Sequence, residues 1–341
     1  MGQLIYGVDM GTSNFKIYNI GTERIINEKN VIAIKDKKQV FEFGDYAFEM
    51  YEKAPENINV SFPIKNGVIA DLENMDTLFT CFYKKVNDGK LVAGSDFCIS
   101  VPTDITEVEK RAFYEVIMHS KIKPKNIVVV EKPIADAVGV GIDIDSPKGN
   151  MIVNFGADTT EISVVSLGGI VLSKLIKTGG NKFDESICNS VRKKHNLIIG
   201  MRTAERVKMA LADALFDEDD GKVYTAFGRN IVSGFPVSKQ ITRELVYNSL
   251  LEQMGSIVDS IKVILERTPP ELAADIIDTG IYVTGGSGLI KNFDKLLHKE
   301  TGLDIKVADK PSESVIRGLK TIVSEPAYKT LMYVPREKQY K

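Results

Sequence analysis

Residues 151–163, MIVNFGADTTEIS, decide the fold of this chain. A short apolar run enters a turn of small and polar residues and leaves as a second, alternating run, which is the pattern of a β-hairpin. Residues 5–17, IYGVDMGTSNFKI, repeat the pattern near the start of the chain. Two hairpins of one pattern predict a duplicated α/β domain with a cleft between the two turns.

The two hairpins align position by position: Asp9 with Asn154, Gly11 with Gly156, Thr12 and Ser13 with Ala157 and Asp158, and Ile17 with Ile162. Glycine lets a main chain approach a ligand closely, and successive N–H groups in a tight turn bind anions. The pair therefore predicts a site that clamps a polyphosphate from two sides. An ordinary tight turn is the alternative for either hairpin alone, but a third glycine turn at Gly285 favours the ligand site.

Composition narrows the class of protein. The chain has 341 residues, enough for two domains, with 43% hydrophobic and 26% charged residues, as in a soluble globular protein. A net charge of -2 argues against a nucleic-acid binder held by overall charge, although a local basic patch stays an alternative. The 3 Cys and 3 His are too few and scattered for a disulfide framework or a zinc site. No apolar run approaches the roughly 18 residues of a membrane span, and no room is left for a signal peptide, so we expect a cytoplasmic protein.

Apolar patterning predicts the remaining elements. Strands are expected at 4–8, 15–20, 30–34, 39–43, 97–101, 127–130, 170–176 and 281–284, with a polar strand-like stretch at 224–236. Helices are expected at 72–86, 134–140, 182–194, 203–215, 242–267 and 289–301, and one starts at Thr106, whose partner Glu109 completes a capping box. Pro269-Pro270 should stop the long helix, and a solvated tail should follow residue 325, with a membrane or partner contact as the alternative.

The order of these motifs resembles a known superfamily. The hairpin, EKPIADAVG, NFGADTTE, TAERVK and VTGGSGL look like the actin-type ATPases, and HNLIIGMRTAERVK, VSLGGIV and TPPELAADIIDTGIYVTGG look like the MreB family, the bacterial actins of cell shape. The resemblance implies a two-lobed, ribonuclease H-like duplicated fold with four subdomains around a nucleotide cleft. The implied divisions are 1–30, 72–145 and 315–341 (IA), 31–71 (IB), 146–180 and 241–314 (IIA), and 181–240 (IIB).

The resemblance also assigns roles to residues. It implies that Gly11, Thr12, Ser13 and Asn14 form the first phosphate loop and that Gly156, Ala157, Asp158, Thr159 and Thr160 form the second. Glu205 and Lys208 match the pair that meets the ribose and adenine, and Gly285, Gly286, Ser287 and Gly288 match the loop beside the nucleoside. Asp9, with Asn154 through water, matches the magnesium side. ATP or ADP with Mg is therefore expected, although a ribose contact does not separate ATP from GTP.

The chain departs from the family pattern where hydrolysis takes place. The family's second loop typically reads Asp, apolar, Gly, Gly, Gly, Thr, Thr, Glu, but residues 154–161 read NFGADTTE. The strand-end motif Glu-Glu-Pro is here Glu131-Lys132-Pro133, so a lysine stands where an acid orients the attacking water. A carboxylate accepts a hydrogen bond from water, whereas an ammonium only donates. Asn154 removes a negative charge near the metal, and Asp158 adds one near the phosphates.

These departures predict nucleotide binding with weak or absent hydrolysis, through a Lys132 to Asp158 ion pair in the water site. Losing the acid should slow the reaction by several powers of ten, each about 1.4 kcal/mol. The alternatives are an active ATPase and a takeover by Glu131, although neighbouring strand residues point to opposite faces. We therefore expect a degenerate hydrolytic site, whose positions are held by Lys132, Glu131, Asp158 and Thr159.

The implied partners follow from the family. We expect homopolymer filaments, association with paralogous MreB filaments, and a weak contact with the inner face of the cell membrane through Leu91 and Val92 in the loop at 88–97. A small-molecule kinase of the same superfamily would have no reason to carry the long MreB phrases. A chaperone ATPase would need a substrate-binding domain after residue 341, so both are the weaker readings.

Overall fold

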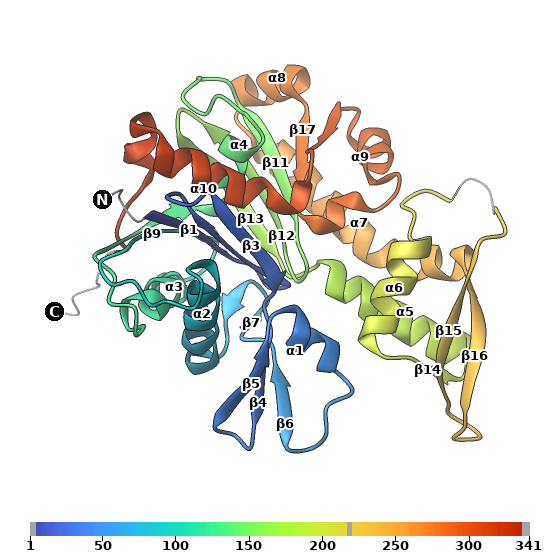
Figure 1. The fold of residues 1–341 in the computed structure, drawn as a ribbon. Coiled ribbons are helices and arrows are strands. Elements are labelled where there is room, and N and C mark those ends of the chain that lie inside the picture. Colours follow the sequence, from blue (N-terminus) through green and yellow to red (C-terminus); the bar gives the residue numbers. More distant parts are fainter. Residues whose placement is uncertain (1–4, 217–219, 336–341) are drawn as a thin grey trace. The chain divides into compact units, whose positions relative to one another are not determined.

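The computed structural model describes residues 5–216 and 220–335, and this part of the chain divides into two compact units (Figure 1). Unit 1 comprises Met1–Pro147, Val165–Leu175 and Ser312–Lys341, and unit 2 comprises Lys148–Val164 and Ile176–Pro311. The sequence did not predict that Val165–Leu175 would join unit 1. Contacts with residues 103 and 104 explain it, because Ser173 Oγ lies 2.5 Å from Thr103 Oγ1 and the N–H of Leu175 donates to Asp104.

Unit 1 is built on a five-stranded sheet in the order β10-β9-β1-β2-β3. Its strands are β1 (Ile5–Met10), β2 (Asn14–Asn19), β3 (Arg24–Lys29), β9 (Asp96–Val101) and β10 (Asn126–Glu131). The β1–β2 hairpin is antiparallel, and β9 runs parallel to both β1 and β10. The predicted hairpin is thus present. The sequence missed β3, an edge strand in which only Ile26 is buried, so it carries too little apolar alternation to be seen.

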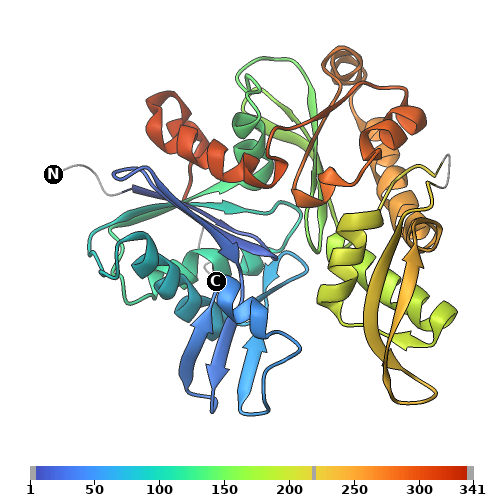
Figure 2. The same ribbon diagram turned by 45° about the vertical axis from the view of Figure 1, so that its right-hand side comes forward.

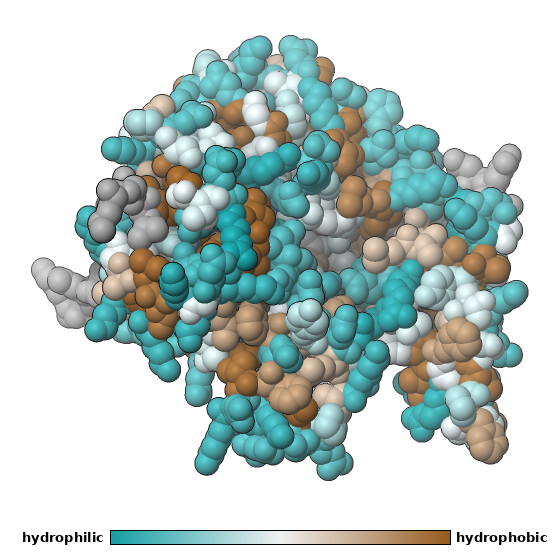
Figure 3. Space-filling model, viewed as in Figure 1, coloured by the Kyte–Doolittle hydropathy of each residue, from teal (hydrophilic) through white to brown (hydrophobic). Residues whose placement is uncertain are grey.

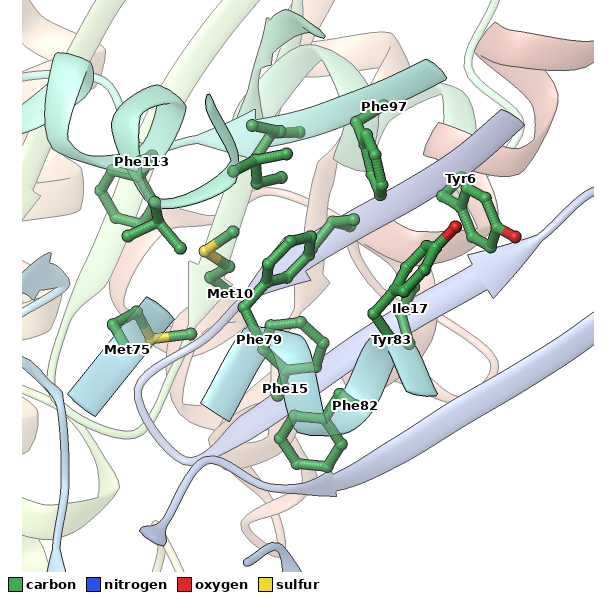
Figure 4. Close-up of a cluster of buried hydrophobic side chains, with 14 of the residues drawn as sticks. Tyr6, Met10, Phe15, Ile17, Met75, Phe79, Phe82, Tyr83, Phe97 and Phe113 are labelled. Atoms are coloured by element: carbon green, nitrogen blue, oxygen red, sulfur yellow. The ribbon is translucent and has the colours of Figure 1, made fainter. Parts of the chain in front are cut away.

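The core of unit 1 lies between this sheet and helices α2 (Leu72–Val86) and α3 (Glu107–Met118). Both helices match the prediction, and the Thr106–Glu109 capping box is formed. Figure 4 shows aromatic rings of α2 packed against the strands, with Phe15 and Phe82 stacked at a centroid distance of 4.5 Å. Burial of this aromatic cluster contributes much of the hydrophobic stabilisation of the unit.

The loop after α2 differs from its expected role in membrane contact. Leu91 is 44% exposed, but Val92 packs against the core of unit 1. The Tyr83 hydroxyl donates to the carbonyl oxygen of Val92 at 2.8 Å and lies 2.7 Å from Ser95 Oγ. Val92 is therefore only partly available to a membrane, because the Tyr83 hydroxyl binds its carbonyl oxygen and its side chain packs against the core. Membrane contact through this loop stays a prediction.

Two helices of unit 1 touch through their backbones. They are α4 (Lys132–Gly139), which begins directly after β10, and α10 (Ser314–Ser324). A Cβ on Gly139 would lie 1.8 Å from the carbonyl oxygen of Ser314, and one on Gly318 would lie 1.6 Å from that of Ala135. No side chain fits at either position, so glycine is required for this helix contact.

A smaller sheet and the chain end complete unit 1. The order β5-β4-β6 joins β4 (Ile32–Lys35), β5 (Gln39–Phe43) and β6 (Ile58–Ser61), accompanied by α1 (Asp45–Met50) and the pair β7 (Ile64–Lys65) and β8 (Val68–Ile69). After α10 come the 3-10 helix η3 (Pro326–Leu331) and Tyr333, which exchanges backbone hydrogen bonds with Val129. No residue of η3 is buried, so this part of the tail is ordered but accessible to solvent, as predicted. The tail residues Arg336, Lys338, Tyr340 and Lys341 lie outside the described residues.

Unit 2 contains most of a second five-stranded sheet, ordered β13-β12-β11-β17-β18. The strands are β11 (Asn150–Phe155), β12 (Thr160–Ser166), β13 (Gly169–Ile176), β17 (Ile281–Thr284) and β18 (Ile305–Val307), of which Val165–Leu175 belongs to unit 1. The second predicted hairpin is thus β11 and β12. As β1 pairs in parallel with β9 in unit 1, β11 pairs in parallel with β17 in unit 2.

The helices of unit 2 are α5 (Gly180–His195), α6 (Met201–Leu211), α7 (Arg243–Arg267), α8 (Pro270–Thr279) and α9 (Phe293–Thr301), with 3-10 turns η1 (Gly286–Leu289) and η2 (Pro311–Glu313). The helix predicted to reach residue 215 ends at Leu211, because the buried Asp213 carboxylate turns in to pair with Arg243 and Lys291. The helix predicted at 289–301 starts at Phe293, after Asn292 takes a left-handed conformation with φ 58°.

Two further features of unit 2 correct the prediction. Pro270 does not only stop α7; it also starts α8, since proline fits the first helical turn. The strand-like stretch at 224–236 is a hairpin of β15 (Val223–Asn230) and β16 (Pro236–Thr242), which joins β14 (Leu197–Ile198) in a three-stranded sheet. In Figures 1 and 2 the β15–β16 hairpin extends beyond the ends of α5 and α6.

Within the described residues, no helix combines the length and apolar character that crossing a bilayer requires.

Candidate functional site

The two hairpin turns are built alike. The N–H of Gly11 donates to the carbonyl oxygen of Asn14 at 3.1 Å, and the N–H of Gly156 donates to that of Thr159 at 2.9 Å. A Cβ on Gly11 would lie 2.8 Å from the Asn14 oxygen, and one on Gly156 would lie 2.9 Å from the Thr159 oxygen. Each glycine is therefore required by its own turn, and the alignment drawn from the sequence extends to the backbone geometry.

The first turn is held from one side by the connection between β3 and β4. The Asn30 side chain donates to the carbonyl oxygen of Gly11 at 2.8 Å, and its N–H donates to that of Ser13 at 2.8 Å. The Lys29 ammonium donates to Ser13 Oγ at 3.2 Å. Two carbonyl oxygens of the turn are thus occupied, and a positive charge lies beside it. Both features favour an anion at this turn.

Asp9, at the end of β1, is the charged centre of the unit 1 half of the site. Its carboxylate is 3% exposed. Oδ2 accepts from the Lys16 ammonium at 2.9 Å, and Oδ1 accepts from Ser100 Oγ at 3.0 Å and lies 3.3 Å from the Lys132 ammonium. Burial alone would raise the pKa of Asp9, but the Lys132 and Lys16 charges outweigh it and hold that pKa well below the ordinary value. Asp9 therefore stays ionised between two ammonium groups.

Glu131 and Lys132 serve different neighbours although they are adjacent in sequence. Glu131 Oε1 accepts from the Lys110 ammonium at 3.1 Å and from the Tyr333 hydroxyl at 2.6 Å. Glu131 also lines a pocket of about 350 Å³ whose other walls include Ile134 and Leu331. Oε1 of Glu131 is thus bound to α3 and the chain end, whereas its buried Oε2 has no hydrogen-bond partner among the described residues. The ammonium of Lys132 instead contacts Asp9.

The second turn, in unit 2, packs against the first turn of α5. The N–H groups of Gly180 and Asn181 donate to the carbonyl oxygens of Gly156 and Ala157 at 3.1 and 2.7 Å. The side-chain amide of Asn181 donates to Asp158 Oδ1 at 2.7 Å. This places the turn at the positive end of the α5 dipole, where negative charge is stabilised.

Lys208 and Ser287 converge on the same place from α6 and η1. Lys208 donates to the carbonyl oxygen of Gly180 and to Asp184 Oδ2, both at 2.8 Å. Ser287 Oγ donates to the carbonyl oxygen of Gly156 at 2.8 Å. A Cβ on Gly180 would lie 2.7 Å from Ser287 Oγ and 3.2 Å from the Lys208 ammonium. The missing side chain at Gly180 therefore lets three elements meet at the second turn.

The loop at 285–288 is fixed to the end of β11. Gly285 has φ 79°, and a Cβ on it would lie 2.3 Å from the carbonyl oxygen of Phe155. Its N–H donates to Pro311 at 2.8 Å, and the N–H of Gly288 closes the loop onto Gly285 at 3.1 Å. Only glycine fits at position 285, so this close approach explains the first residue of the GGSG motif.

The predicted site residues are divided between the two units. Unit 1 holds Asp9, Gly11, Thr12, Ser13, Asn14, Glu131 and Lys132, and unit 2 holds Asn154, Gly156, Ala157, Asp158, Thr159, Glu205, Lys208, Gly285, Gly286, Ser287 and Gly288. Glu205 lies one helical turn before Lys208 on α6. Because Lys132 and Asp158 belong to different units, the ion pair between them stays a prediction.

Sequence reasoning missed residues that support the predicted ones. Lys16 could have been found, since the predicted hairpin pairs it with Asp9 across β1 and β2. Gly180 was interpreted only as part of a turn. Asn30, Lys29 and Asp184 act through contacts distant in sequence, for which a single sequence carries no signal.

The donor set fits phosphate better than magnesium. The first glycine turn, with the Lys29 ammonium at Ser13 Oγ, suits an anionic ligand. Both oxygens of Asp9 already meet cationic or hydroxyl donors, and Asn154 offers an amide instead of a charge. Among the residues that the structure describes, no three His, Cys, Asp or Glu side chains gather so that they could hold a metal ion. These residues do not fit a magnesium ion that depends on free carboxylates.

The fold and these half-sites define an actin-like protein. A solved structure of MreB5 of Spiroplasma citri bound to AMPPNP matches with a TM-score of 0.90 at 32% identity, covering 97% of this chain and 98% of that one. MreB5 bound to ADP matches with a TM-score of 0.88 at 32% identity, over 94% and 96% of the two chains. A MamK double helical filament, at 22% identity over 95% and 99% of the two chains and a TM-score of 0.78, shares the fold.

The family model described as MreB/Mbl protein matches residues 4–330. The cell shape-determining protein Mbl of Bacillus subtilis (strain 168) is 38% identical over 313 residues, 92% of this chain and 93% of that protein. The cell shape-determining protein MreB of Escherichia coli (strain K12) is 36% identical over 317 residues, 91% and 90% of the two chains. The chain belongs to the MreB/Mbl family, which confirms the resemblance drawn from the sequence.

Proposed function

We propose that this chain is a filament-forming cytoskeletal protein of cell shape that binds ATP or ADP and hydrolyses ATP weakly or not at all. The observation that carries the first part is the family match over residues 4–330. The likeness to MreB5 bound to AMPPNP and to ADP supports nucleotide binding. A kinase or chaperone role finds no support in these relatives.

The site residues of the two units would have different roles in binding the nucleotide. The turns at Gly11 and Gly156 would hold the phosphate chain through backbone N–H groups, helped by the Lys29 charge and the α5 dipole. Glu205 would meet the ribose. Lys208 binds Asp184 and Gly180, so its part would be to hold the start of α5 in place for the nucleoside. These residues bind and orient, and none of them needs to exchange a proton.

The Asp9–Lys132 contact supports the proposal of weak hydrolysis. Attack by water requires an acceptor that aligns the water with the terminal phosphate. The position that carries this acceptor in the family holds an ammonium here, and it lies 3.3 Å from Asp9 Oδ1. Oε1 of Glu131, the alternative acceptor, is engaged by Lys110 and Tyr333. The runner-up is an ordinary active ATPase, which would require one of these residues to rearrange on binding ATP.

We further propose that filaments assemble from copies of this chain, alone or with paralogous MreB chains, at the inner face of the cell membrane. The four-subdomain division expected from the sequence is part of the same proposal. If hydrolysis is weak, polymer turnover depends on nucleotide exchange or on active partner filaments. Many weak membrane contacts along one filament would add up by avidity.

Nucleotide-dependent sedimentation followed by electron microscopy tests this function. The purified chain should pellet as filaments with ATP or with AMPPNP, because assembly needs binding and not hydrolysis. Glu205→Ala should weaken both nucleotide binding and pelleting, whereas the control Glu266→Ala, at the end of α7, should change neither. Monomers under all nucleotide conditions, with nucleotide bound, would contradict the filament proposal.

A further inference from the structure

Lys29 brings a positive charge to the first glycine turn. Strands β2 and β3 pair so that Lys29 lies opposite Asn14, the last residue of the turn. From this position its ammonium donates to Ser13 Oγ at 3.2 Å. Two further lysines of unit 1 instead contact the buried carboxylate of Asp9. The charge of Lys29 is thus placed at the turn itself, where an anionic ligand would bind.

The backbone of Lys29 is held on both sides. Its N–H donates to Asp45 Oδ1, in the first turn of α1, at 2.9 Å, and its carbonyl oxygen accepts from the N–H of Val31 at 3.0 Å. The next residue, Asn30, is fully buried and makes two hydrogen bonds to the turn. Any shift of this backbone would break hydrogen bonds of a buried amide. The position of Lys29 beside the turn is therefore fixed, and only its side chain adjusts to a ligand.

The ring of Phe48, on α1, lies against the end of the Lys29 side chain. The Lys29 ammonium is 4.5 Å from the centroid of this ring, within the range of a cation–π interaction. Phe48 also packs against the small core of Val31, Ala33 and Ala47, which the small sheet forms with α1. Figure 3 shows brown and tan residues over this part of unit 1. The ring therefore holds the ammonium near the turn and reduces the side-chain entropy that Lys29 would lose on binding a ligand.

The charge of a nucleotide decides what such a lysine can distinguish. A nucleoside triphosphate is more negative than the diphosphate, because it carries one more phosphate group. Backbone N–H groups of a turn offer only partial charges to any phosphate of the chain. An ammonium is a full, compact charge with three N–H donors, so it can bind a hydroxyl and phosphate oxygens together. Its attraction grows with the charge of the ligand, which favours the triphosphate.

We propose that Lys29 binds the terminal phosphate of a nucleoside triphosphate and makes the site prefer ATP over ADP, with Phe48 as the positioning residue. The two contacts of the ammonium, with Ser13 Oγ and with the Phe48 ring, carry this inference. Phe48 acts only through Lys29. The inference rests on the proposed nucleotide binding and names the residue that distinguishes the triphosphate from the diphosphate.

Binding titrations of the full-length chain with AMPPNP and ADP test the role of Lys29. AMPPNP resists hydrolysis, so the titration measures binding alone. Lys29→Met should raise the Kd for AMPPNP by about tenfold, equivalent to about 1.4 kcal/mol, and the Kd for ADP by less than about threefold. Lys29→Arg should keep most of the preference, since it retains the charge. Lys38→Met, on the exposed turn between β4 and β5, is the matched control and should change neither Kd.

A double-mutant cycle tests whether Phe48 acts through Lys29. Phe48→Leu removes the ring but keeps an apolar side chain in the small core, and should raise the Kd for AMPPNP by about threefold. In the Lys29→Met background the same substitution should have no further effect, because the ammonium that the ring positions is gone. Phe62→Leu, whose ring meets that of Phe48 edge-on at 6.4 Å, is the control and should leave the Kd unchanged.

The outcomes separate this inference from the proposed function. Equal changes of the AMPPNP and ADP affinities in Lys29→Met, or no change in either, would overturn the inference, because Lys29 would then only support the turn. Lys29→Gln keeps a donor for Ser13 without the charge, so it provides the same comparison should Lys29→Met fail to fold. An additive effect of Phe48→Leu in Lys29→Met would overturn the positioning role of Phe48. A wild-type chain that binds neither nucleotide would instead contradict the proposed function, and the inference with it.

Discussion

The ammonium of Lys132 lies 3.3 Å from Oδ1 of Asp9, and the ammonium of Lys16 lies 2.9 Å from Oδ2 of the same carboxylate. One buried carboxylate is thus held between two lysines. The relationship has consequences for chemistry, for metal dependence and for stability, and each can be measured by itself.

Hydrolysis should be slow in the wild-type chain and should return when the acid is restored. Lys132→Glu with Asp158→Gly supplies an acceptor for water and removes a negative charge beside the phosphates. We expect steady-state phosphate release to rise by about a hundredfold, equivalent to about 2.7 kcal/mol of barrier. Lys90→Glu, on an exposed loop of unit 1, is the control and should leave the rate unchanged. A wild-type rate equal to that of Bacillus subtilis Mbl at matched concentration would contradict the expectation.

Nucleotide binding should depend little on divalent cations. In wild type the Lys132 charge already neutralises Asp9, where a metal would otherwise be needed beside the phosphates. Titration with a fluorescent ATP analogue should give a Kd that changes by less than about threefold between Mg²⁺ and EDTA, under about 0.7 kcal/mol. Lys132→Glu places a second carboxylate near Asp9 and should make binding Mg²⁺-dependent. Loss of wild-type binding in EDTA would show that the lysine does not replace the cation.

Replacing Asp9 should destabilise the fold. Asp9→Asn leaves the ammonium groups of Lys16 and Lys132 without their buried countercharge, which should lower the free energy of unfolding by about 3–5 kcal/mol. Because the folded-state pKa of Asp9 is lowered from 3.8, its stabilisation is fully present above that value and is lost as the pH falls further. Urea unfolding at pH 7 and pH 5 should therefore show the same difference. Asp88→Asn, in an exposed pair with Arg24, should change little.

The backbone contact between α4 and α10 should tolerate no methyl group. Gly318→Ala places a Cβ against the Ala135 carbonyl and should destabilise the protein by about 3 kcal/mol. Gly255→Ala, in the middle of α7, is the matched control because a Cβ there has nothing within 4 Å. It should stabilise the protein by up to about 1 kcal/mol, since alanine favours helices. Thermal unfolding measures both, and equal effects would mean that the contact is looser than described.

The loop after α2 should be neutral in membrane binding. Leu91 is exposed singly, and Val92 packs against the core, so the loop offers one aliphatic side chain. Leu91→Ser should therefore co-sediment with anionic vesicles as wild type does. A strong loss would show that this loop makes the membrane contact after all.

Sequence patterning predicted the elements that show a regular apolar period or a local motif. The paired hairpins, α2, α3 and α7 follow from regular apolar spacing, and Gly11, Gly156 and Gly285 follow from turns that only glycine fits. Patterning failed where a distant partner decides the outcome. Helix α6 ends early because Asp213 pairs with Arg243 and Lys291, and the chain end is held by Tyr333 at Val129.

The same holds for the candidate site, where local motifs were predicted and contacts between distant residues were not. The residues of each turn were predicted, because their chemistry is written in the motif itself. The contact of Lys132 with Asp9 was not, since it joins the ends of β10 and β1, which are linked only through β9. The predicted partner, Asp158, was inferred from its charge and from the family fold, and that pair stays a prediction.

The route of the chain around α4 has a practical implication. Strand β10 leads into α4, α4 is pressed against α10 through two glycines, and the segment after α10 returns to β10 through Tyr333 and Glu131. The Tyr333 contact with Glu131 therefore lies one residue from Lys132. Substituting Tyr333 would release this contact, so fluorescent tags meant for imaging are better inserted into an exposed internal loop, such as the one carrying Lys90, than near Tyr333.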